Sequence, residues 1–517
     1  MKAVESSVPT SEVPIEIESL SALAAKANVS LTMIVRDEER VLEECLRSAK
    51  GVFTQIVVVD TGSRDRSMEI ASTFGVDQFE VKWKDSFAEA RNIALSKATG
   101  DWVFWMDADD TLPPDSARAI LQAAIEAPAD VVGFIVPVQY PGADSTRVDH
   151  LKLFRNLKGL QWCYRVHEQI YPSLVSRGRI ERIDACILHS NYDATPAGRS
   201  RKRARNERLL KLDLKDFPND AVILFNLGAQ AHDHSHHKEA AQWLEESIKR
   251  SKPAESHVRK AFALLAGSRQ ALGDVQGALV ACEIGLKVVG EDPELRFRCG
   301  QALAGLGRFE EAKQQYLLVS DPAHEYLKSL DMAIIGPKRD HNLALVCAEL
   351  GEQFEAKEWL RKAIDAGFAQ SAVVLFEYAF DQNDLVTAGS ALDNLRALEG
   401  VTGLWTVLAM KLAAHRGQSE ESFLEEMVSH HPEATAPALL LAKRLLDAGR
   451  EQEAEPYLKF LEKKGQADAP FLRGAIAGRK GEFIPAIAHT QRALELEPNH
   501  EGAMRQLEVL KRAMGQG

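Results

Sequence analysis

Apolar positions change their spacing near residue 198 of this 517-residue chain. Before that point, short continuous apolar runs alternate with segments in which apolar residues recur at helical spacing. The runs predict strands at residues 31–35, 55–60, 78–81, 101–106, 131–138, 149–154 and 183–189. Helical spacing predicts helices at residues 38–49, 66–74, 86–98 and 116–127. Such alternation is typical of an α/β domain whose sheet is mostly parallel and covered by helices.

The second half of the chain is helical throughout and contains an internal repeat. Short turns followed by a small residue align eight positions: Ala240, Ala278, Ala312, Ala356, Ala388, Ser422, Ala454 and Ala486. Neighbouring positions are mostly 32 to 38 residues apart, with one separation of 44. The pattern, over about residues 220–505, resembles the tetratricopeptide repeat, a helix–turn–helix unit of about 34 residues. The resemblance implies about eight hairpins that stack into an all-α solenoid with a concave surface.

These patterns predict a tail at residues 1–27, an α/β domain at 28–197 and a repeat domain at 198–517. The tail contains one candidate helix near residues 17–26. No apolar run approaches the ~18 residues of a membrane span, and the first residues lack the pattern of a signal peptide. Six scattered cysteines without a Cys-x-x-Cys pair indicate reduced thiols, so we expect a cytoplasmic protein. The net charge of −12 argues against general nucleic-acid binding.

The candidate chemistry begins where the apolar run 101–106 ends. The segment 105–110 reads Trp-Met-Asp-Ala-Asp-Asp, which places carboxylates directly after a buried strand. Open α/β sheets bind ligands beyond the carboxyl ends of their strands, and Mg²⁺ takes carboxylate and phosphate oxygens as ligands. The alternative interpretation is that Asp109, Asp110 and Thr111 cap the helix that follows Pro113. The tripeptide alone leaves both interpretations open.

Three further motifs precede this one. Residues 34–39 read Ile-Val-Arg-Asp-Glu-Glu, residues 57–65 read Val-Val-Val-Asp-Thr-Gly-Ser-Arg-Asp, and residues 88–94 read Ala-Glu-Ala-Arg-Asn-Ile-Ala. In this order and spacing, the four motifs resemble those of the inverting family 2 glycosyltransferases over about residues 30–192. The resemblance implies a Rossmann-like GT-A fold and a nucleotide-sugar donor. Arg36 and Asp37 depart from the family pattern, which often has an aromatic residue and Asn there.

The resemblance also implies roles for individual residues. Asp60 would contact the base of the donor nucleotide, and Glu38 would line the nucleoside pocket with the backbone near Val35. Arg91 would neutralise phosphate charge, which suits a guanidinium that is always protonated. Asp107 would face the ribose and sugar of the donor. Asp109 would hold Mn²⁺ or Mg²⁺ on the diphosphate, where a cation offsets the charge that develops on the leaving group, and Asp110 would cap the next helix.

A second cluster lies at residues 162–170, Trp-Cys-Tyr-Arg-Val-His-Glu-Gln-Ile. An inverting transfer needs a general base for the acceptor's proton, and Glu168 is the candidate, with His167 as the alternative. A structural Glu168 paired with Arg165 is the competing interpretation. His189, at the end of the run 183–189, is a candidate third metal ligand or a structural histidine.

Two further clusters have plainer interpretations. His232, His234, His236 and His237 fall in the first turn of the repeats, where an exposed polar turn is favoured over a metal site because no acidic or cysteine partner accompanies them. The basic run 199–205 lacks interleaved aromatic residues, so we interpret it as a solvated helix face between the domains.

Taken together, the residues and the resemblance predict a metal-dependent glycosyltransferase that uses a nucleotide sugar, expected to be a UDP-sugar. Only about ninety residues separate the acidic motif from the repeats, so we expect the repeats to supply part of the site for a protein or peptide acceptor. A role of the repeats in joining copies of the chain is the alternative. Rival functions are transfer to lipopolysaccharide or another surface glycan, and a repeat-based scaffold with a degenerate transferase domain.

Overall fold

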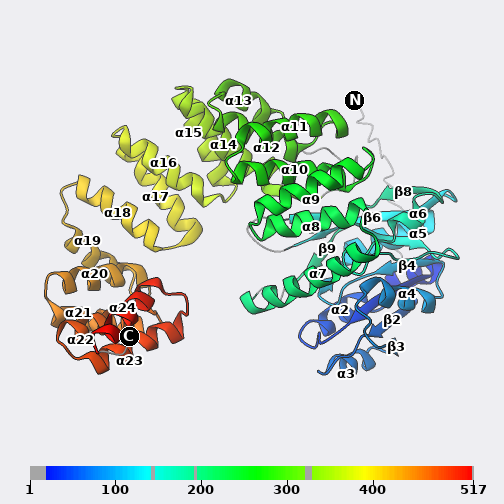
Figure 1. The fold of residues 1–517 in the computed structure, drawn as a ribbon, viewed down its shortest axis with the longest axis horizontal. Helices are drawn as coiled ribbons and strands as arrows, with labels where there is room; N and C mark the ends of the chain where they lie inside the picture. The colour runs from blue at the N-terminus through cyan, green and yellow to red at the C-terminus, as the bar shows by residue number, and fades with distance from the viewer. Residues whose placement is uncertain (1–18, 141–145, 191–194, 321–328, 515–517) are drawn as a thin grey trace, which may run out of the picture. The chain divides into compact units, whose positions relative to one another are not determined.

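The computed structural model of the chain describes residues 19–140, 146–190, 195–320 and 329–514. Contacts within the chain divide it into two compact units, Met1–Gly351 and Glu352–Gly517. The first unit contains a ten-stranded mixed sheet with its covering helices and the first helical hairpins (Figure 1). The second unit consists of helices only.

The sheet begins with four parallel strands, β1 (Val29–Val35), β2 (Gln55–Asp60), β3 (Asp77–Glu80) and β4 (Trp102–Trp105). Side chains from α1 (Leu20–Ala27), α2 (Leu42–Ala49) and α5 (Pro114–Glu126) form one core cluster with strands β1 and β4. On the opposite face, Ala94 of α4 (Phe87–Lys97) packs with Val57 and Val59. Burial on both faces explains why residues 56–59 of β2 and all of β4 are continuously apolar. The mostly parallel arrangement expected from the alternating pattern is therefore present in this half of the sheet.

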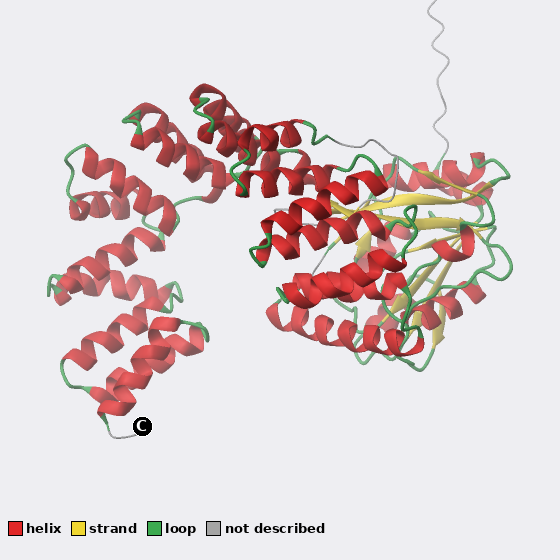
Figure 2. Ribbon diagram, turned by 45° about the horizontal axis from the view of Figure 1, so that its top comes forward, coloured by secondary structure: helices red, strands yellow, loops and turns green. Residues whose placement is uncertain are grey.

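The other half of the sheet is antiparallel. Strand β7 (Thr146–Arg155) runs antiparallel to both β4 and β6 (Val131–Gln139). The full order is β3-β2-β1-β4-β7-β6-β9-β5. Figure 2 shows the strands of this sheet in yellow with helices packed beside them. Of the strand expected at 183–189, only the last three residues form a strand, β9 (Ile187–His189). Strand β8 (Arg179–Arg182) precedes the expected range and was not predicted. β9 pairs with β5 (Asp110–Thr111), which brings His189 opposite Asp110.

The remaining elements of the first unit connect the sheet to the repeats. They are α3 (Ser67–Ser72), α6 (Tyr171–Leu174), α7 (Pro196–Asp216), α8 (Ala221–Asp233), α9 (His237–Arg250), α10 (His257–Ala271), α11 (Val275–Val289), α12 (Pro293–Gly305), α13 (Phe309–Leu317), β10 (Ser329–Asp331), the 3₁₀ helix η1 (Met332–Ile335) and α14 (Pro337–Glu349). Strand β10 pairs antiparallel with β7, so a segment that follows three hairpins completes the sheet. No pattern in the sequence predicted this strand.

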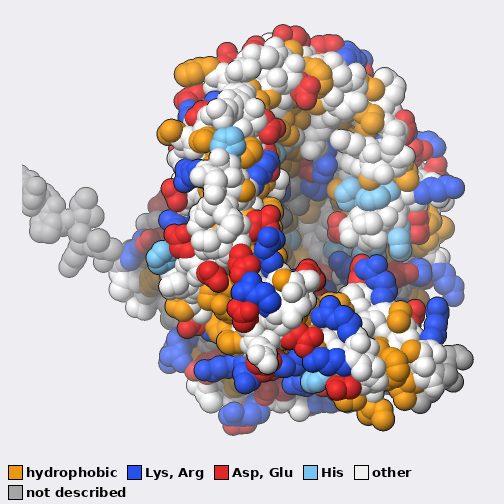
Figure 3. Space-filling model, turned by 90° about the vertical axis from the view of Figure 1, so that its left-hand side faces the viewer, with side chains coloured by type: hydrophobic (Ala, Val, Ile, Leu, Met, Phe, Trp, Pro, Cys, Tyr) orange, Lys and Arg blue, Asp and Glu red, His pale blue; other side chains and the backbone are white. Residues whose placement is uncertain are grey.

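The second unit contains α15 (Gln353–Asp365), α16 (Ala369–Asp381), α17 (Leu385–Glu399), α18 (Gly403–His415), α19 (Glu420–His430), α20 (Thr435–Asp447), α21 (Glu451–Lys463), α22 (Asp468–Arg479), α23 (Phe483–Leu496) and α24 (Glu501–Ala513). Acidic and basic side chains are mixed over the face shown in Figure 3. Charged side chains of this unit form ion pairs between neighbouring helices, such as Arg473 with Glu455 at 3.0 Å. Among the described residues, no helix is both long enough and apolar enough to span a bilayer.

A left-handed residue marks each turn of the aligned repeats. The residue five positions before each aligned residue has a positive φ, at Ser235, Gly273, Gly307, Gly351, Asn383, Gly417, Gly449 and Gly481. This conformation ends the first helix of a hairpin and is easiest for glycine. It places the aligned alanines at the helix contact, where all seven are at most 1% exposed. The periodic small residue is therefore a packing feature of the hairpins.

Ser422 is an exception to this alignment. It is exposed, and Phe423 takes the buried position beside it. Helix α19 begins three residues after Gly417, whereas α21 begins two residues after Gly449. The longer turn shifts the helix by one residue, so the aligned residue rotates away from the contact.

Candidate active site

The carboxyl ends of three parallel strands place the sequence motifs along one edge of the sheet. Asp60 ends β2 and lies in register with Val35, which ends β1. Asp107 and Asp109 follow β4, the strand on the other side of β1. The parallel order therefore brings together residues that are far apart in the sequence, at the edge where α/β sheets bind ligands.

Arg91 connects the acidic motif to the second cluster. Its Nη2 donates to Asp107 Oδ1 at 2.7 Å, and its Nε donates to Glu168 Oε1 at 2.6 Å. The Arg91 side chain is 6% exposed, and it lies 4.3 Å from the ring centre of Trp105 and 5.2 Å from that of Trp162. Burial lowers the pKa of Arg91, but Glu168 and Asp107 outweigh it, so the pKa is raised. A charge buried between two carboxylates and two aromatic rings has one well-defined position.

The ion-pair partner of Glu168 differs from the one in the competing structural interpretation. The expected structural pair with Arg165 does not form, because Arg165 pairs with Asp213 and Asp216 of α7. Glu168 pairs instead with Arg91, 77 positions away in the chain. Its carboxylate therefore belongs to the same network as Asp107.

A tight loop holds His167 and Glu168 in place. Cys163 and Gln169 exchange two backbone hydrogen bonds of 3.0 Å, so the chain reverses between them. Tyr164 and His167 have positive φ values of 70° and 55°, which is uncommon for residues other than glycine. The Asn92 side chain also binds the backbone of Trp162 through both its oxygen and its nitrogen. The Ala-Arg-Asn motif thus positions this loop as well as supplying Arg91.

Asp109, Asp110 and His189 form a group that could hold a metal ion, with ligand atoms within 4.8 Å of one another. His189 Nδ1 lies 3.0 Å from Asp110 Oδ1, and its Nε2 lies 3.3 Å from Asp109 Oδ2. Burial raises the pKa of Asp109, whereas His189 opposes this rise only partly. Two carboxylates and an imidazole are suitable ligands for Mn²⁺ or Mg²⁺. The structure brings together Asp109 and His189, the two residues proposed as ligands from the sequence.

Asp110 does not cap the next helix, contrary to our expectation. The helix α5 begins at Pro114 without a side-chain cap, and Asp110 is 1% exposed. Its Oδ2 accepts hydrogen bonds from Lys152 Nζ at 3.0 Å and from the backbone N–H of Asp107 at 3.1 Å. The pairing of β5 with β9 turns Asp110 toward the sheet and His189, so it cannot reach the helix.

Lys152 is a residue that the sequence analysis missed. Its side chain is 1% exposed, and its Nζ lies 3.6 Å from the ring centre of Trp105 as well as 3.0 Å from Asp110. The available signal was a lysine between Leu151 and Leu153 of β7, since a lysine buried in a strand requires a partner. Lys152 offsets part of the negative charge of the acidic cluster.

The residues expected to bind the nucleoside lie at the ends of β1 and β2. The Asp60 carboxylate is 5% exposed and accepts from the backbone N–H and the hydroxyl of Ser63, at 3.1 and 2.6 Å. The Val35 carbonyl accepts from the Thr61 N–H at 3.0 Å. The Glu38 N–H donates to Ser67 Oγ at 2.7 Å, so the loops after the two strands hold each other. These residues form one rim of the edge that carries Asp107 and Asp109.

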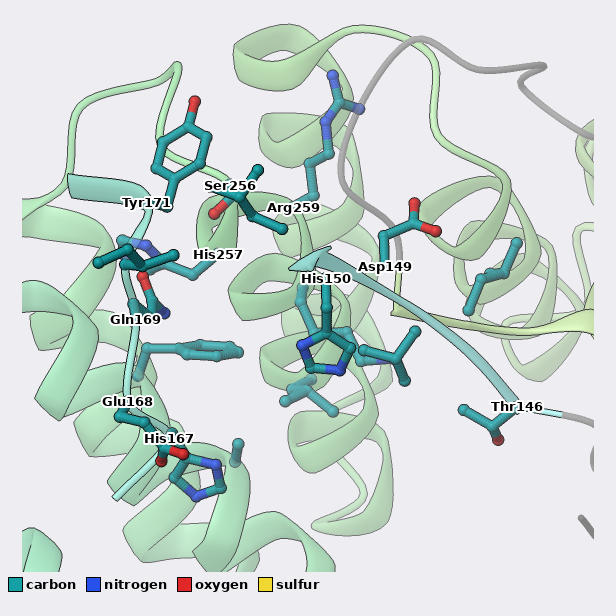
Figure 4. Close-up of a pocket in the computed structure, with 18 of the residues that line it drawn as sticks. Thr146, Asp149, His150, His167, Glu168, Gln169, Tyr171, Ser256, His257 and Arg259 are labelled. Carbon is teal, nitrogen blue, oxygen red and sulfur yellow. The ribbon is translucent and has the colours of Figure 1, made fainter. Parts of the chain in front are cut away.

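A cavity of about 700 Å³ opens beside Glu168 and lies between the sheet and the first repeats. On the sheet side it is lined by β7 and by the segment 167–171, and on the other side by α8, α10 and the start of α12. Figure 4 shows Glu168 and His167 at one end of this cavity and His257, Ser256 and Arg259 of the repeats across it. The aromatic part of the cavity wall consists of Trp105, Trp162, Tyr171 and Phe225. The cavity therefore connects the candidate base to the repeats.

The histidine-rich turn and the basic run lie outside the acidic cluster. Among the described residues, the four turn histidines form no group of three ligand atoms that could hold a metal. His232 instead lies 2.8 Å from Ser268 Oγ through its Nδ1. The side chains of Arg201, Lys202 and Arg203 are exposed on α7, in keeping with the solvated face that we expected. Lys202 and Arg203 also line a second cavity of about 260 Å³ that His167 borders.

Comparisons with known proteins agree with this geometry. Residues 30–186 match the family model described as glycosyl transferase family 2. The chain therefore carries a family 2 glycosyltransferase domain, followed by helical hairpins of the tetratricopeptide type.

Two curated relatives are each named for one of these two features. The chain is 33% identical over 264 residues to a TPR repeat-containing protein of Synechococcus elongatus, which covers 50% of this chain and 65% of the relative. It is 26% identical over 249 residues to the SPbeta prophage-derived glycosyltransferase SunS of Bacillus subtilis, which covers 46% of this chain and 58% of SunS. The matches thus span less than two thirds of these curated relatives. A solved structure of Pseudomonas aeruginosa pilF is 18% identical, with a TM-score of 0.32, over 43% of this chain and 97% of that chain.

Proposed function

We propose that this protein is a metal-dependent, inverting glycosyltransferase that moves a sugar from a nucleotide-sugar donor, a UDP-sugar, to a protein or peptide acceptor. The proposed catalytic domain comprises residues 28–197, and the repeats at 198–517 contribute to acceptor binding. One observation carries the proposal: Arg91 binds Asp107 and Glu168 together. This pair joins the family motif for the donor to a carboxylate that borders a cavity large enough for an acceptor side chain.

The donor half of the reaction would use the sheet edge. Asp60 and Glu38, with the backbone of Val35, would hold the nucleoside, and Asp107 would bind the ribose and sugar. Asp109 and His189, with Asp110 beside them, would hold Mn²⁺ or Mg²⁺, and a cation there offsets the negative charge of the departing diphosphate. Arg91 would orient Asp107 and place a positive charge next to the phosphates.

The acceptor half would use the cavity. The acceptor's nucleophilic atom attacks the anomeric carbon of the sugar, and the bond between that carbon and the diphosphate oxygen breaks. The acceptor's proton passes to the Glu168 carboxylate, with His167 as the alternative base. Attack from the face opposite the leaving group inverts the anomeric configuration. Arg91 holds Glu168 in one orientation, which favours proton transfer over a fixed short distance.

The proposal for a protein or peptide acceptor rests on the walls of the cavity. Three helices of the repeats, α8, α10 and α12, line it opposite the sheet. Helical repeats usually present surfaces that bind peptides or proteins. Transfer to lipopolysaccharide or another surface glycan is the rival, since the aromatic residues in the wall would also suit a sugar ring.

Donor binding tests the enzymatic proposal against the scaffold alternative. We expect Mn²⁺ and one of a set of UDP-, GDP- and dTDP-sugars to raise the melting temperature of the full chain, because a ligand stabilises the state that binds it. Asp109→Ala should abolish this rise and donor hydrolysis. Asp115→Ala, at the exposed start of α5, is the matched control and should leave both unchanged. If the melting temperature and donor hydrolysis depend neither on Mn²⁺ nor on Asp109→Ala, the scaffold alternative is favoured.

A second variant tests the acceptor cavity without truncating the chain. Leu209 and Leu210 of α7 pack on Val166 beside Glu168, so cutting at residue 198 would expose the core of the domain. Ser256→Trp, at the exposed start of α10, would instead fill the larger cavity and does not border the cavity that Lys202 lines. We expect it to block acceptor transfer and to spare donor hydrolysis, whereas Ala271→Trp, at the exposed end of α10, should spare both. Transfer that survives Ser256→Trp unchanged would refute the cavity as the acceptor site.

A further inference from the structure

Helix α7 lies next to the site, although the sequence suggested only a solvated connection. Arg208 of this helix donates to both carboxylate oxygens of Asp85 at 2.7 Å. The Asp213 carboxylate accepts from the backbone N–H of Arg165 at 2.9 Å. Leu209 and Leu210 are fully buried in a cluster with Val166. The helix is thus docked on the loop that presents His167 and Glu168.

Two basic side chains extend from this docked helix toward the site. Lys202 and Arg205 are spaced three residues apart, so they lie on neighbouring turns of one side. Lys202 lines the cavity of about 260 Å³ that His167 borders, and it interacts electrostatically with Asp109 and His167. Arg205 lies 4.8 Å from the ring centre of Phe87 at the start of α4, and it interacts electrostatically with Glu168 and Glu38. Lys202 therefore lies near Asp109, the proposed metal ligand. Arg205 lies near Glu168, the proposed base, and near Glu38, which is proposed to line the nucleoside pocket.

The other cations of the site are already committed to carboxylates. Arg91 is bound by Asp107 and Glu168, and Lys152 by Asp110. In the described part of the chain, Lys202 and Arg205 form no ion pair with a carboxylate, and Arg205 binds only the neutral side chain of Asn206 at 3.1 Å. A ligand with two or three negative charges that enters beside Asp107, Asp109 and Asp110 is stabilised by cations that are free to pair with it. Lys202 and Arg205 meet this need, since each interacts electrostatically with a carboxylate of the site.

We propose that Lys202 and Arg205 of α7 bind the diphosphate group of the donor and of the nucleoside diphosphate product, so that the first helix after the catalytic domain completes the donor site. The guanidinium of Arg205 can bind two phosphate oxygens in its plane, and the Lys202 ammonium supplies a compact charge near Asp109. The inference rests on the proposed function for the identity of the ligand, but it can be tested with a diphosphate alone.

The test measures binding of inorganic pyrophosphate, UDP and uridine to the full chain with Mn²⁺ by titration calorimetry. We expect the double variant Lys202→Gln and Arg205→Gln to weaken pyrophosphate and UDP binding by at least about tenfold, the effect of losing one charged hydrogen bond. Uridine binding should remain unchanged. The double variant Lys211→Gln and Lys215→Gln removes two exposed positive charges from the same helix and should leave all three affinities unchanged. Lys202→Arg with Arg205→Lys should restore most of the pyrophosphate affinity.

The outcomes separate this inference from the proposed function. The inference is overturned if the wild-type chain binds no pyrophosphate, if the Lys202 and Arg205 variant binds it as the control variant does, or if uridine binding falls by the same factor. If the chain consumes nucleotide sugars but the Lys202 and Arg205 variant binds pyrophosphate with unchanged affinity, the proposed function stands and the inference fails. If pyrophosphate binding depends on the two cations but no nucleotide sugar is consumed, the inference stands and the function fails.

Discussion

At the scale of single residues, Arg91 has the most consequences. A fully buried guanidinium is expensive unless each of its donors is matched, and here two carboxylates and two indole rings surround it. Removing either carboxylate would leave a buried charge only partly compensated. The ion pair therefore supports the fold as well as the orientation of Glu168, and a test of Glu168 has to separate these two roles.

Glu168→Gln separates them because the amide oxygen can still accept from Arg91. We expect kcat for transfer to fall by about 10²- to 10⁴-fold, the usual contribution of a general base, with KM for the donor nearly unchanged. The melting temperature should fall as well, because the hydrogen bond is kept but the Arg91 charge loses one of its two carboxylate partners. Steady-state kinetics and thermal unfolding measure these quantities. Glu181→Gln, on β8 and paired with Arg179, is the matched control. A lower melting temperature with kcat preserved would assign Glu168 a structural role and make His167 the candidate base.

At the scale of elements, the hairpins depend on close contact where a glycine faces a large side chain. A Cβ atom at Gly228 of α8 would lie 2.7 Å from Leu244 Cγ of α9, whereas a Cβ at Gly389 of α17 would have no atom within 4 Å. Overpacking costs about 1–3 kcal/mol, and replacing a helical glycine by alanine gains about 1 kcal/mol. The two positions therefore predict opposite signs for the same substitution.

We expect Gly228→Ala to lower the free energy of unfolding by up to about 2 kcal/mol and Gly389→Ala to raise it by up to about 1 kcal/mol. Urea titration followed by circular dichroism measures both changes. Equal effects of the two substitutions would show that the α8–α9 contact adjusts to the extra methyl group.

The ion pair that docks α7 makes the free energy of unfolding depend on pH. The hydrogen bond from Arg208 lowers the pKa of Asp85 to about 2. Since the folded pKa is below the unfolded value of about 3.9, the pair contributes fully above about pH 4, and its contribution is lost as the pH falls toward 2. Asp85→Asn should therefore lower the free energy of unfolding at pH 6 and flatten its decline between pH 4 and 2.

The expected change for Asp85→Asn is at most about 1 kcal/mol, because exposed ion pairs contribute little. Urea titrations at several pH values measure it, with Asp115→Asn as the control for loss of one exposed carboxylate. An unchanged pH profile would mean that the buried leucines alone dock the helix.

At the scale of the whole molecule, the candidate site lies entirely in the first compact unit. All residues of the site precede Gly351 in the chain. They comprise the acidic cluster, the loop with Glu168, the residues that line both cavities, and helix α7. Strand β10 also lies in this unit and closes the sheet against β7. The division between units falls in the turn that joins α14 and α15, inside the stretch where the sequence predicted one continuous array.

A chain that ends at Gly351 should therefore fold and retain metal-dependent donor hydrolysis with kcat within about threefold of the full chain, since it loses no residue of the donor site. Thermal unfolding and a hydrolysis assay with Mn²⁺ measure this. Loss of transfer to the acceptor with donor hydrolysis intact would show that the second unit binds the acceptor. Loss of both activities in a folded chain would contradict the assignment of the site to the first unit.

The sequence by itself determined the local elements and the identity of the donor motifs. Apolar runs and helical spacing located the first four strands and the hairpins because both patterns report which side of an element is buried. The motifs around Asp60, Arg91 and Asp109 indicated the family because their order and spacing resemble those of family 2 glycosyltransferases, and residues 30–186 match the model of that family. The roles of these residues in binding and catalysis remain predictions.

Only the tertiary structure decided which residues meet. The pair between Arg91 and Glu168, the burial of Asp110 against Lys152 and His189, and the position of α7 beside Glu168 all join segments far apart in the chain. Periodicity shows that a residue is buried or exposed but carries no information about its partner, because the partner depends on strand order and direction. For that reason we interpreted the basic run 199–205 from the sequence as a solvated connection between the domains. In the folded chain it lies beside the candidate active site.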